Sequence, residues 1–353
     1  MGSQPKALDI LHLVEYQKFI PPFIDLLNQE LEVGRHHFYF LHNGHKYVPQ
    51  GVVKVSCNAK PKNIFRFTFD LFIEAFRAEK IILHGLFSSR LLFALVLQPW
   101  LWRRCYWIIW GGDLYTYALD ARTWKWRLKE VFRKILIANI GHLVTYISGD
   151  VALARQWYGA KGVHHECIMY PSNTYQPLPA INKPHQGLNI LIGNSADPSN
   201  NHAEIIKKLK ILGGKINKVI APLSYGEKEY AREVTALGIK EFGHDFVALE
   251  EFMGYDDYLE ILAEVDVAVF NHQRQQGMGN IISLLGMGKT VAIRSDISTW
   301  ELFLEIGVVL RDTLDLDLSP LPIEVLTNNQ RIIKEKFSIQ RLVYQLKSIL
   351  ENS

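Results

Sequence analysis

Cysteine is scarce in this chain of 353 residues. The three cysteines, Cys57, Cys105 and Cys167, stand far apart and show no paired spacing. A disulfide framework needs an even set of cysteines, and a zinc knuckle needs closely spaced pairs. The sequence encodes neither, so we expect three free, buried thiols.

Long apolar runs are also missing. The nearest candidate, residues 91–97, ends at Gln98 and Pro99, well short of the roughly 18 to 20 residues that a membrane-spanning helix requires. The first residues lack the apolar core of a signal peptide, and Lys6 stands where a myristoylation signal has Ser or Thr. We therefore expect a cytoplasmic protein that does not span a membrane.

The composition is that of a globular protein, with 48% apolar and 21% charged residues and no low-complexity tract. The net charge of +3 hides an uneven distribution. Residues 1–180 hold 21 Lys and Arg against 13 Asp and Glu, a net +8, and the remainder holds 18 against 23, a net −5. The first part is therefore expected to face an anionic partner, either a membrane surface or a nucleic acid.

Strand and helix patterns alternate along the chain. Strand-like apolar runs recur between helical patterns, at residues 7–14, 37–41, 51–55, 80–84, 188–192, 218–221, 265–270 and 290–293. A Pro-rich segment, residues 170–184, interrupts the series and resembles a linker. This alternation predicts parallel sheets covered by helices, in a first domain at 1–180 and a second at 181–328.

Polar residues that follow the predicted strands are the positional candidates for a site, because ligands of open α/β sheets bind beyond the carboxyl ends of strands. In the first domain this criterion selects His12, His42, His45, His84 and Asp113. His84 precedes Gly85 and is either a base or a cap of the next helix. Asp113 follows two glycines and is either a base that deprotonates a hydroxyl or a helix N-cap.

Two turns of small polar residues follow strands in the second domain. Residues 193–200 form one turn, and such a turn before a helix leaves backbone N–H groups free for a phosphate. Ordinary turn chemistry explains the same residues equally well. Residues 274–280 form the other, with Arg274 ahead of two glycines and an apolar helix. The presence of both turns favours a diphosphate ligand.

Tryptophans and basic residues are interleaved between residues 100 and 134. The predicted membrane- or acceptor-facing residues are Trp100, Trp102, Arg103, Arg104, Trp124, Lys125, Trp126 and Arg127. Indoles prefer the bilayer interface, and basic residues are attracted to anionic lipid. A helix at about 121–138 is predicted to lie on a membrane; the alternative is a solvated helix face above core tryptophans.

Taken together, these residues resemble the TDP-N-acetylfucosamine:lipid II N-acetylfucosaminyltransferases, glycosyltransferase family 56. The matching residues fall in the same order over most of the chain: His84, Gly85, Phe87, Trp107, Trp110, Gly111, Asp113, Leu114, Tyr115, Gly193, Asn194, Ser195, Asp197, Ser199, Asn200, His202, Arg274, Gln275, Gln276, Gly277 and Gly279. Gly112, Ala196 and Asn280 depart from the pattern, which has Ala, Gly and Thr there. Only the change at Asn280 removes a functional group, a hydroxyl.

The resemblance implies an α/β fold of GT-B type, two Rossmann-like domains with parallel sheets facing an interdomain cleft. It also implies a C-terminal segment, 329–353, with a helix at 329–350 that packs back on the first domain. The implied donor is a dTDP-linked 4-acetamido-4,6-dideoxy-D-galactose. The implied acceptor is a polyprenyl-diphosphate-linked saccharide at the cytoplasmic face of the bacterial inner membrane. Neither a metal nor another cofactor is expected, because helix N-termini and basic side chains stabilise the leaving diphosphate.

The resemblance assigns proton transfer to Asp113 or His84. The expected donor-binding residues are Gly193, Asn194, Ser195, Asp197, Ser199, Asn200, Tyr225, Arg274, Gln275, Gln276, Gly277, Gly279, Asn280 and Glu301. The residues by themselves leave two alternatives open. One is another enzyme of this fold, such as a nucleotide-sugar epimerase, and the other is a non-enzymatic, nucleotide-binding protein docked on a membrane. A nucleic-acid partner is not expected.

Overall fold

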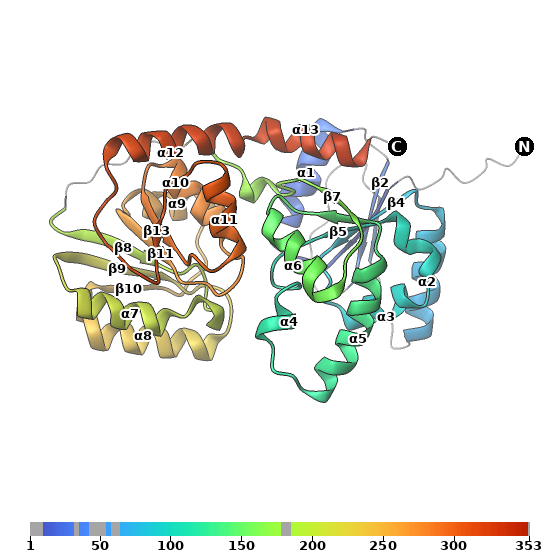
Figure 1. The fold of residues 1–353 in the computed structure, drawn as a ribbon, viewed down its shortest axis with the longest axis horizontal. Coiled ribbons are helices and arrows are strands. Elements are labelled where there is room, and N and C mark those ends of the chain that lie inside the picture. Colours follow the sequence, from blue (N-terminus) through green and yellow to red (C-terminus); the bar gives the residue numbers. More distant parts are fainter. Residues whose placement is uncertain (1–9, 32–34, 42–53, 58–63, 178–184, 352–353) are drawn as a thin grey trace, which may run out of the picture. The chain divides into compact units, whose positions relative to one another are not determined.

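The computed structural model describes residues 10–31, 35–41, 54–57, 64–177 and 185–351. The chain forms two compact units, one of residues 1–172 with 339–353 and the other of residues 173–338 (Figure 1). These limits differ from the predicted borders at 180/181 and 328/329. Two positional candidates, His42 and His45, lie outside the described residues.

The first unit contains a parallel sheet in the order β3-β2-β1-β4-β5-β6-β7. Its strands are β1 (Ile10–Val14), β2 (His36–Phe40), β3 (Lys54–Cys57), β4 (Lys80–His84), β5 (Cys105–Ile108), β6 (His142–Val144) and β7 (Val163–His165). The order reverses between β1 and β4, so neighbouring loops leave the sheet in opposite directions there.

Helices cover both faces of this sheet. They are α1 (Ile20–Glu30), α2 (Ile64–Arg77), α3 (Ser89–Val96), α4 (Thr116–Leu119), α5 (Trp124–Asn139), α6 (Ser148–Tyr158) and α13 (Ile339–Leu350), with 3-10 turns η1 (Pro99–Arg104) and η2 (Pro171–Asn173). Figure 1 shows α1 and α13 on one side of the sheet and α3 and α5 on the other. Leu92, Leu136 and Ala154 pack on the second side against Leu83 and Trp107 of the strands.

The second unit contains a parallel sheet in the order β10-β9-β8-β11-β12-β13. Its strands are β8 (Leu188–Ile192), β9 (Ile216–Pro222), β10 (Phe246–Leu249), β11 (Val267–Phe270), β12 (Thr290–Ile293) and β13 (Arg311–Asp312). Here the order reverses between β8 and β11. Both sheets are doubly wound, as the predicted fold class requires.

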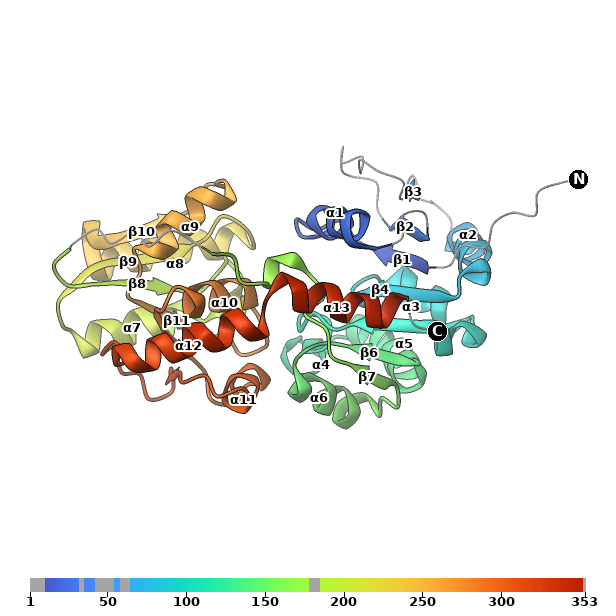
Figure 2. The same cartoon turned by 90° about the horizontal axis from the view of Figure 1, so that it is seen from above.

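The helices of the second unit also form two layers. They are α7 (His202–Leu212), α8 (Lys228–Phe242), α9 (Tyr255–Ala263), α10 (Met278–Gly286), α11 (Ser298–Glu305) and α12 (Ile323–Lys336), with 3-10 turns η3 (Pro198–Asn200) and η4 (Gly243–Asp245). Figures 1 and 2 show α7 and α8 on one face of the sheet, and α10 packed beside α12 on the other. Ile206, Leu209 and Val234 close the core on the α7 side.

The single helix predicted at 329–350 is two helices in the structure. The first, α12, ends at Lys336 in the second unit, and α13 begins at Ile339 in the first. Lys80 anchors α13, because its Nζ donates to the carbonyl oxygen of Ile349 at 2.7 Å and to that of Leu350 at 3.4 Å. An ammonium at the negative end of a helix satisfies carbonyls that have no intrahelical partner.

Candidate active site

The two turns predicted in the second unit lie together at its switch point. Gly193 directly follows β8, and Asn271 directly follows β11, its neighbour in the sheet. Ligands of doubly wound sheets bind at this place, beyond the carboxyl ends of the strands. Side chains from the two turns are hydrogen-bonded although they stand up to 82 residues apart in the chain.

The side chain of Asn200 organises the first turn. Its Oδ1 accepts a hydrogen bond from the backbone N–H of Asn194 at 3.0 Å and lies 2.9 Å from Nε2 of His272. Its Nδ2 donates to the carbonyl oxygen of Asp197 at 3.0 Å and to Oγ of Ser195 at 3.3 Å. Asn200 is only 1% exposed, so it shapes the turn and does not itself face a ligand.

Several backbone N–H groups that we expected to be free in this turn are occupied. Gly193 donates to a carbonyl of β11 at 3.0 Å, Ala196 donates to a carbonyl of the loop after β9 at 2.8 Å, and Asn194 donates to the Asn200 side chain. The helix α7 begins only at His202, after η3. The expectation of an open helix N-terminus at this turn is wrong, because nearby acceptors take its donors.

An ion pair connects the two turns. Nη2 of Arg274 lies 2.9 Å from Oδ2 of Asp197. Oδ1 of Asp197 accepts hydrogen bonds from the backbone N–H and the hydroxyl of Ser199 at 2.9 and 2.6 Å. Burial by itself would raise the pKa of Asp197, but the hydrogen bonds from Ser199 and the charge of Arg274 outweigh burial and lower it. The carboxylate is therefore ionised at neutral pH and holds the guanidinium in place.

Amide and phenol groups extend this network. Nε2 of Gln276 donates to Oδ1 of Asn194 at 3.1 Å, and Nδ2 of Asn194 donates to the hydroxyl of Tyr225 at 2.9 Å. Tyr225 follows β9 and is 47% exposed. The structure thus gathers most of the predicted donor-binding side chains: Asn194, Ser195, Asp197, Ser199, Asn200, Tyr225, Arg274 and Gln276.

The first turn of α10 adds backbone donors to this cluster. Gly277 is its N-cap with a φ of +67°, and a Cβ there would lie 2.9 Å from the His272 ring. Gly277 has no side chain that could cap the helix, and the backbone N–H groups of the first turn lie at the positive end of the helix dipole. Nδ2 of Asn280 donates to the hydroxyl of Tyr258 at 2.8 Å. An anion is favoured at such a helix start.

Besides Asn280, which contacts Tyr258, two predicted donor-binding residues stand outside the network of side chains. Glu301 is exposed in the first turn of α11. Gln275 contributes its carbonyl oxygen, which accepts from Nη1 of Arg274 at 3.3 Å. Its side-chain Oε1 is buried and has no hydrogen-bond partner among the described residues. A buried acceptor without a hydrogen-bond partner can accept a hydrogen bond from a donor group of a ligand.

His272 lies at the centre of this cluster. Residues 271–280 follow a predicted strand and were positional candidates, but no role was predicted for His272. Its position next to Asn271, just beyond β11, is the signal that could have found it. Burial, together with the charges of Arg274 and His202, lowers the pKa of His272 to about 3. The neutral ring supports Asn200 from one side and fills the space beneath the second turn.

A chain of imidazoles lies at the switch point of the first unit. Nε2 of His84, the last residue of β4, lies 3.0 Å from Nδ1 of His12, and Nε2 of His12 lies 3.0 Å from Nδ1 of His36. Nδ1 of His84 lies 2.6 Å from the hydroxyl of Tyr170. Burial lowers the pKa of His84 to about 3, so its ring is neutral. His84 does not cap α3, because Ser88 does.

Asp113 is fully buried between two turns of the first unit. Its Oδ2 accepts from the backbone N–H of Leu86 at 2.9 Å and from Nε1 of Trp107 at 2.7 Å, and its Oδ1 accepts from the backbone N–H of Trp110 at 3.0 Å. Burial raises its pKa, and these hydrogen bonds oppose that rise. Neither expected role fits this geometry, because an enclosed carboxylate does not reach a hydroxyl and α4 has another residue at its N-cap. Asp113 joins the turn after β4 to the turn after β5.

The predicted membrane-facing residues fall into two groups. The indoles of Trp102 and Trp126 donate to backbone carbonyls at 2.8 and 3.1 Å, and Arg104 donates to a carbonyl beyond α2 at 2.6 Å. The exposed residues are Trp100, Arg103, Trp124, Lys125 and Arg127. Arg133 of the same basic run is buried and pairs with Glu130 at 2.9 Å. In the part of the chain that the structure describes, no helix has the length and apolarity to cross a bilayer.

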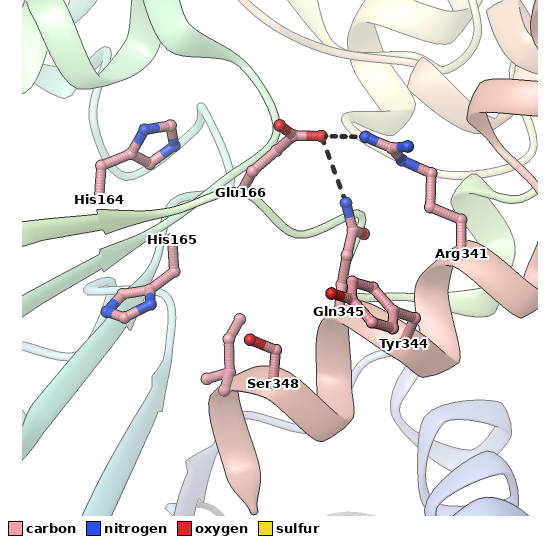
Figure 3. Close-up of a pocket in the computed structure, with 8 residues that line it drawn as sticks. His164, His165, Glu166, Arg341, Tyr344, Gln345 and Ser348 are labelled. Carbon is pink, nitrogen blue, oxygen red and sulfur yellow. Dashed lines mark hydrogen bonds and ion pairs between the residues drawn. The ribbon is translucent and has the colours of Figure 1, made fainter. Parts of the chain in front are cut away.

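A separate pocket of about 360 Å³ lies between β7 and α13 (Figure 3). Glu166 accepts from Arg341 at 2.8 Å and from Nε2 of Gln345 at 3.3 Å, and Oε1 of Gln345 accepts from the backbone N–H of Ile168. These contacts fasten α13 to the unit, and no predicted site residue lines the pocket. Among the described residues, which include the histidines of this pocket, no group of three or more His, Cys, Asp or Glu is placed to hold a metal ion.

Comparison with known proteins identifies relatives of the whole fold. A family model described as 4-alpha-L-fucosyltransferase, glycosyl transferase group 56, matches residues 17–317. HepE of Anabaena, crystallised with UDP and glucose, superposes with a TM-score of 0.69 at 13% identity, covering 98% of this chain and 99% of that one. A glycosyltransferase of Rickettsia africae superposes with a TM-score of 0.64 at 11% identity, covering 99% and 100%. Likenesses at this identity establish the fold, which is of GT-B type.

Replacing Gly193 with Ala should lower the free energy of unfolding by about 3 kcal/mol, since the added Cβ is both strained and crowded. Gly193 has a φ of +66°, and a Cβ there would lie 2.3 Å from Nε2 of His202 and 2.8 Å from Oδ1 of Asn200. Gly159→Ala is the matched control, because its φ is +70° and its ψ is +30° but nothing lies within 4 Å of the added Cβ. It should lose only about 1 kcal/mol. Urea denaturation followed by circular dichroism measures both, and equal losses would contradict the crowding at Gly193.

Acid should destabilise the protein through His84. In the unfolded chain the imidazole titrates near its ordinary value of 6.5, whereas in the folded chain its pKa is about 3. The unfolded state therefore binds the proton first, so stability is complete above pH 6.5 and falls between pH 6.5 and 3, by about 1.4 kcal/mol per pH unit for one such group. His84→Gln should reduce this slope. His244→Gln should not, because the His244 side chain is 96% exposed; identical slopes for the two variants would refute the assignment.

Proposed function

The chain belongs to glycosyltransferase family 56, and we propose that it transfers 4-acetamido-4,6-dideoxy-D-galactose from a dTDP-sugar to a polyprenyl-diphosphate-linked saccharide. The reaction would serve surface polysaccharide synthesis at the cytoplasmic face of a bacterial inner membrane. The observation that carries the donor side is the pairing of Arg274 with Asp197 beside the uncapped start of α10.

A nucleoside diphosphate is the leaving group of this reaction, and it carries negative charge that grows as the glycosidic bond breaks. Arg274 offers a guanidinium held by Asp197, and α10 offers backbone N–H groups at the positive end of its dipole. Donors fixed before the reaction stabilise developing charge without reorganisation. Gln276 and Tyr225 border this ion pair through Asn194 and are proposed to contact the donor.

The remaining donor groups have weaker structural support. The free Oε1 of Gln275 is suited to a hydroxyl or N–H of the donor. Glu301 is proposed, as in the sequence analysis, to bind ribose or sugar hydroxyls, and its exposure leaves it available. Asn200 acts through the turn that it supports.

The acceptor hydroxyl must lose a proton during transfer. Both proton-handling candidates are buried, and both ring nitrogens of His84 have partners, His12 and Tyr170. His84 is proposed to act on this proton through the hydroxyl of Tyr170, which lies 2.6 Å from its Nδ1. Asp113, with both oxygens occupied, positions the loops that flank His84.

Helix α5 supports the proposed contact with a membrane. Trp124, Leu128, Val131 and Ile135 are all exposed, and their i, i+4, i+7, i+11 spacing places them on one stripe of the helix. Lys125 and Arg127 are exposed beside this stripe. An outward apolar stripe with basic neighbours is typical of a helix that lies in an anionic bilayer interface.

Helix α2 repeats this arrangement on the same side of the sheet. Phe69, Ile73 and Phe76 are exposed at i, i+4 and i+7. The α2 and α5 helices both pack on the core that contains Leu71 and Leu136. Two outward apolar stripes give a larger surface for lipid than the single helix predicted from the sequence.

Replacing Arg274 with Gln should weaken binding of TDP about tenfold to a hundredfold, because one charge-assisted contact to the diphosphate is lost. Arg232→Gln is the control, since Arg232 pairs with Glu229 on the exposed surface of α8. Calorimetric titration of both variants and the wild type with TDP, UDP and GDP measures the effect. Unchanged TDP affinity in Arg274→Gln would remove Arg274 from the donor site, and a preference for UDP or GDP would refute the dTDP-sugar donor.

The double replacement Leu128→Ser with Val131→Ser should strongly reduce co-sedimentation with vesicles that contain anionic lipid, since it removes the middle of the α5 stripe. Ile211→Ser is the control, because Ile211 is an exposed apolar residue of α7 in the other unit. Vesicles of neutral lipid should bind the wild type more weakly, because the basic residues contribute about 1 kcal/mol each near an anionic surface. Equal binding by both variants would refute the assignment of the surface.

A further inference from the structure

Three half-buried aromatic rings meet at the carboxyl edge of the first sheet. Phe19 follows β1, Phe87 follows β4, and Trp110 follows β5. The ring of Phe19 stands edge-on to that of Trp110, with centroids 4.6 Å apart and planes at 75°, and the ring of Phe87 lies 5.5 Å from Trp110. We refer to these three rings as the aromatic cradle. They border the β1–β4 switch point, where a doubly wound sheet binds its ligand.

We propose that the aromatic cradle is a subsite for the acceptor, in which a pyranose ring of the acceptor saccharide rests its C–H face on Trp110. This inference rests on the proposed function, in which the first unit receives the acceptor. It adds three named residues to that unit, none of which was predicted from the sequence to bind a ligand.

Buried polar groups hold the cradle in shape from below. Nε1 of Trp110 donates to the hydroxyl of Tyr170 at 3.0 Å, and Tyr170 is in turn hydrogen-bonded to His84. The indole N–H is a donor only, so this bond fixes the plane of the Trp110 ring. The imidazole chain through His12 thereby supports one ring of the cradle.

Asp113 and α5 fix the turns that carry the other groups. The carboxylate of Asp113 accepts hydrogen bonds from the backbone N–H groups of Leu86 and Trp110. Leu86 directly precedes Phe87, and Trp110 belongs to the cradle. From α5, Nζ of Lys129 donates to the carbonyl oxygen of Phe87 at 2.7 Å, and Nη2 of Arg133 donates to that of Leu86 at 3.2 Å. A buried carboxylate is costly unless it is fully hydrogen-bonded. The buried carboxylate of Asp113 therefore indicates that the positions of the turns after β4 and β5 are important to the protein.

The backbone beneath the cradle is also adapted to it. Gly85 has a φ of +83°, and a Cβ at this position would lie 2.6 Å from the ring of Phe87. A larger residue would displace that ring, so the glycine makes room for it. Local conformation and ring position therefore depend on each other.

The chemistry of the cradle fits a neutral sugar. Its surface consists of aromatic rings, and the polar groups hydrogen-bonded beneath it, the hydroxyl of Tyr170 and the indole N–H of Trp110, are uncharged. Binding sites for small molecules combine apolar and aromatic walls with a few fixed polar groups. A pyranose presents an apolar C–H face and polar edges, whereas a diphosphate requires cations or a helix start, which the second unit provides.

The test uses the full chain and an octyl glycoside of N-acetylglucosamine, below its critical micelle concentration, as the probe. Saturation-transfer NMR reports separately on the sugar ring and on the alkyl chain. We expect sugar-ring signals from the wild type, a loss of at least fivefold in Trp110→Ala and Phe87→Ala, and retention of most of the signal in the conservative variant Trp110→Phe. Tyr344→Ala is the control, because it removes a ring that is 76% exposed on α13 of the same unit.

Three results would overturn the subsite: no sugar-ring signal from the wild type, an unchanged signal in folded Trp110→Ala and Phe87→Ala, or an equal loss in Tyr344→Ala. Selective loss of alkyl-chain signals in the cradle variants would also overturn it, since the occupant would then be a lipid tail. Circular dichroism verifies that each variant is folded, and Trp110→Phe keeps the proposal testable if the alanine variants are not.

Binding of TDP, measured in the same samples, separates this inference from the proposed function. TDP affinity should stay within twofold of the wild type in every cradle variant, because the donor cluster belongs to the other unit. If TDP binds and the sugar signal is indifferent to the cradle, the subsite is refuted and the proposed function stands. If the sugar signal depends on Trp110 but TDP does not bind, the proposed donor is refuted and the subsite stands.

Discussion

A parallel sheet whose strand order reverses has one place where adjacent loops diverge, and this constraint governs the arrangement of both units. In the first unit the reversal separates the loop after β1 from the loop after β4, and in the second it separates the loops after β8 and β11. Right-handed crossovers send the connecting helices to opposite faces on the two sides of this point. The chain therefore leaves room beside the strand ends, and the polar side chains that project there do not compete with a helix for space.

Each unit uses buried polar side chains to shape the loops at its reversal. Asn200 engages both ends of its amide in the second unit, and Asp113 engages both carboxylate oxygens in the first. Such groups are stable only when every hydrogen bond is made, because an unsatisfied buried polar group costs about 1 to 3 kcal/mol. The loops are thereby held in one conformation, and the half-buried Arg274 and Trp110 project from rigid supports.

The two sides of helix α5 contribute to different surfaces of the first unit. Its inward side carries Arg133, which reaches the loop after β4, and its outward side carries the apolar stripe that starts at Trp124. The basic residues of this helix are thus not equivalent. Lys129 and Arg133 hold the loop that bears Phe87, while Lys125 and Arg127 face outward. The proposed contact with a membrane and the proposed acceptor subsite thus both involve this one helix.

The sequence by itself determined the fold class, most of the strands, and the two polar turns at 193–200 and 274–280. Those features are local, because apolar periodicity and turn residues act over a few neighbouring positions. The strands β6, β7, β10 and β13 were not predicted. Three of them, β6, β7 and β13, have only two or three residues, which carry too little pattern. Only the tertiary structure decided that Asn200 occupies a backbone donor of its own turn, that Asp113 is enclosed, and that His12 meets His84. The two histidines stand 72 residues apart in the chain, and strand register, which no local pattern encodes, brings them within hydrogen-bonding distance. Asn194 and Asn200 are close in the chain, but a local pattern does not distinguish a free backbone donor from one that a side chain occupies.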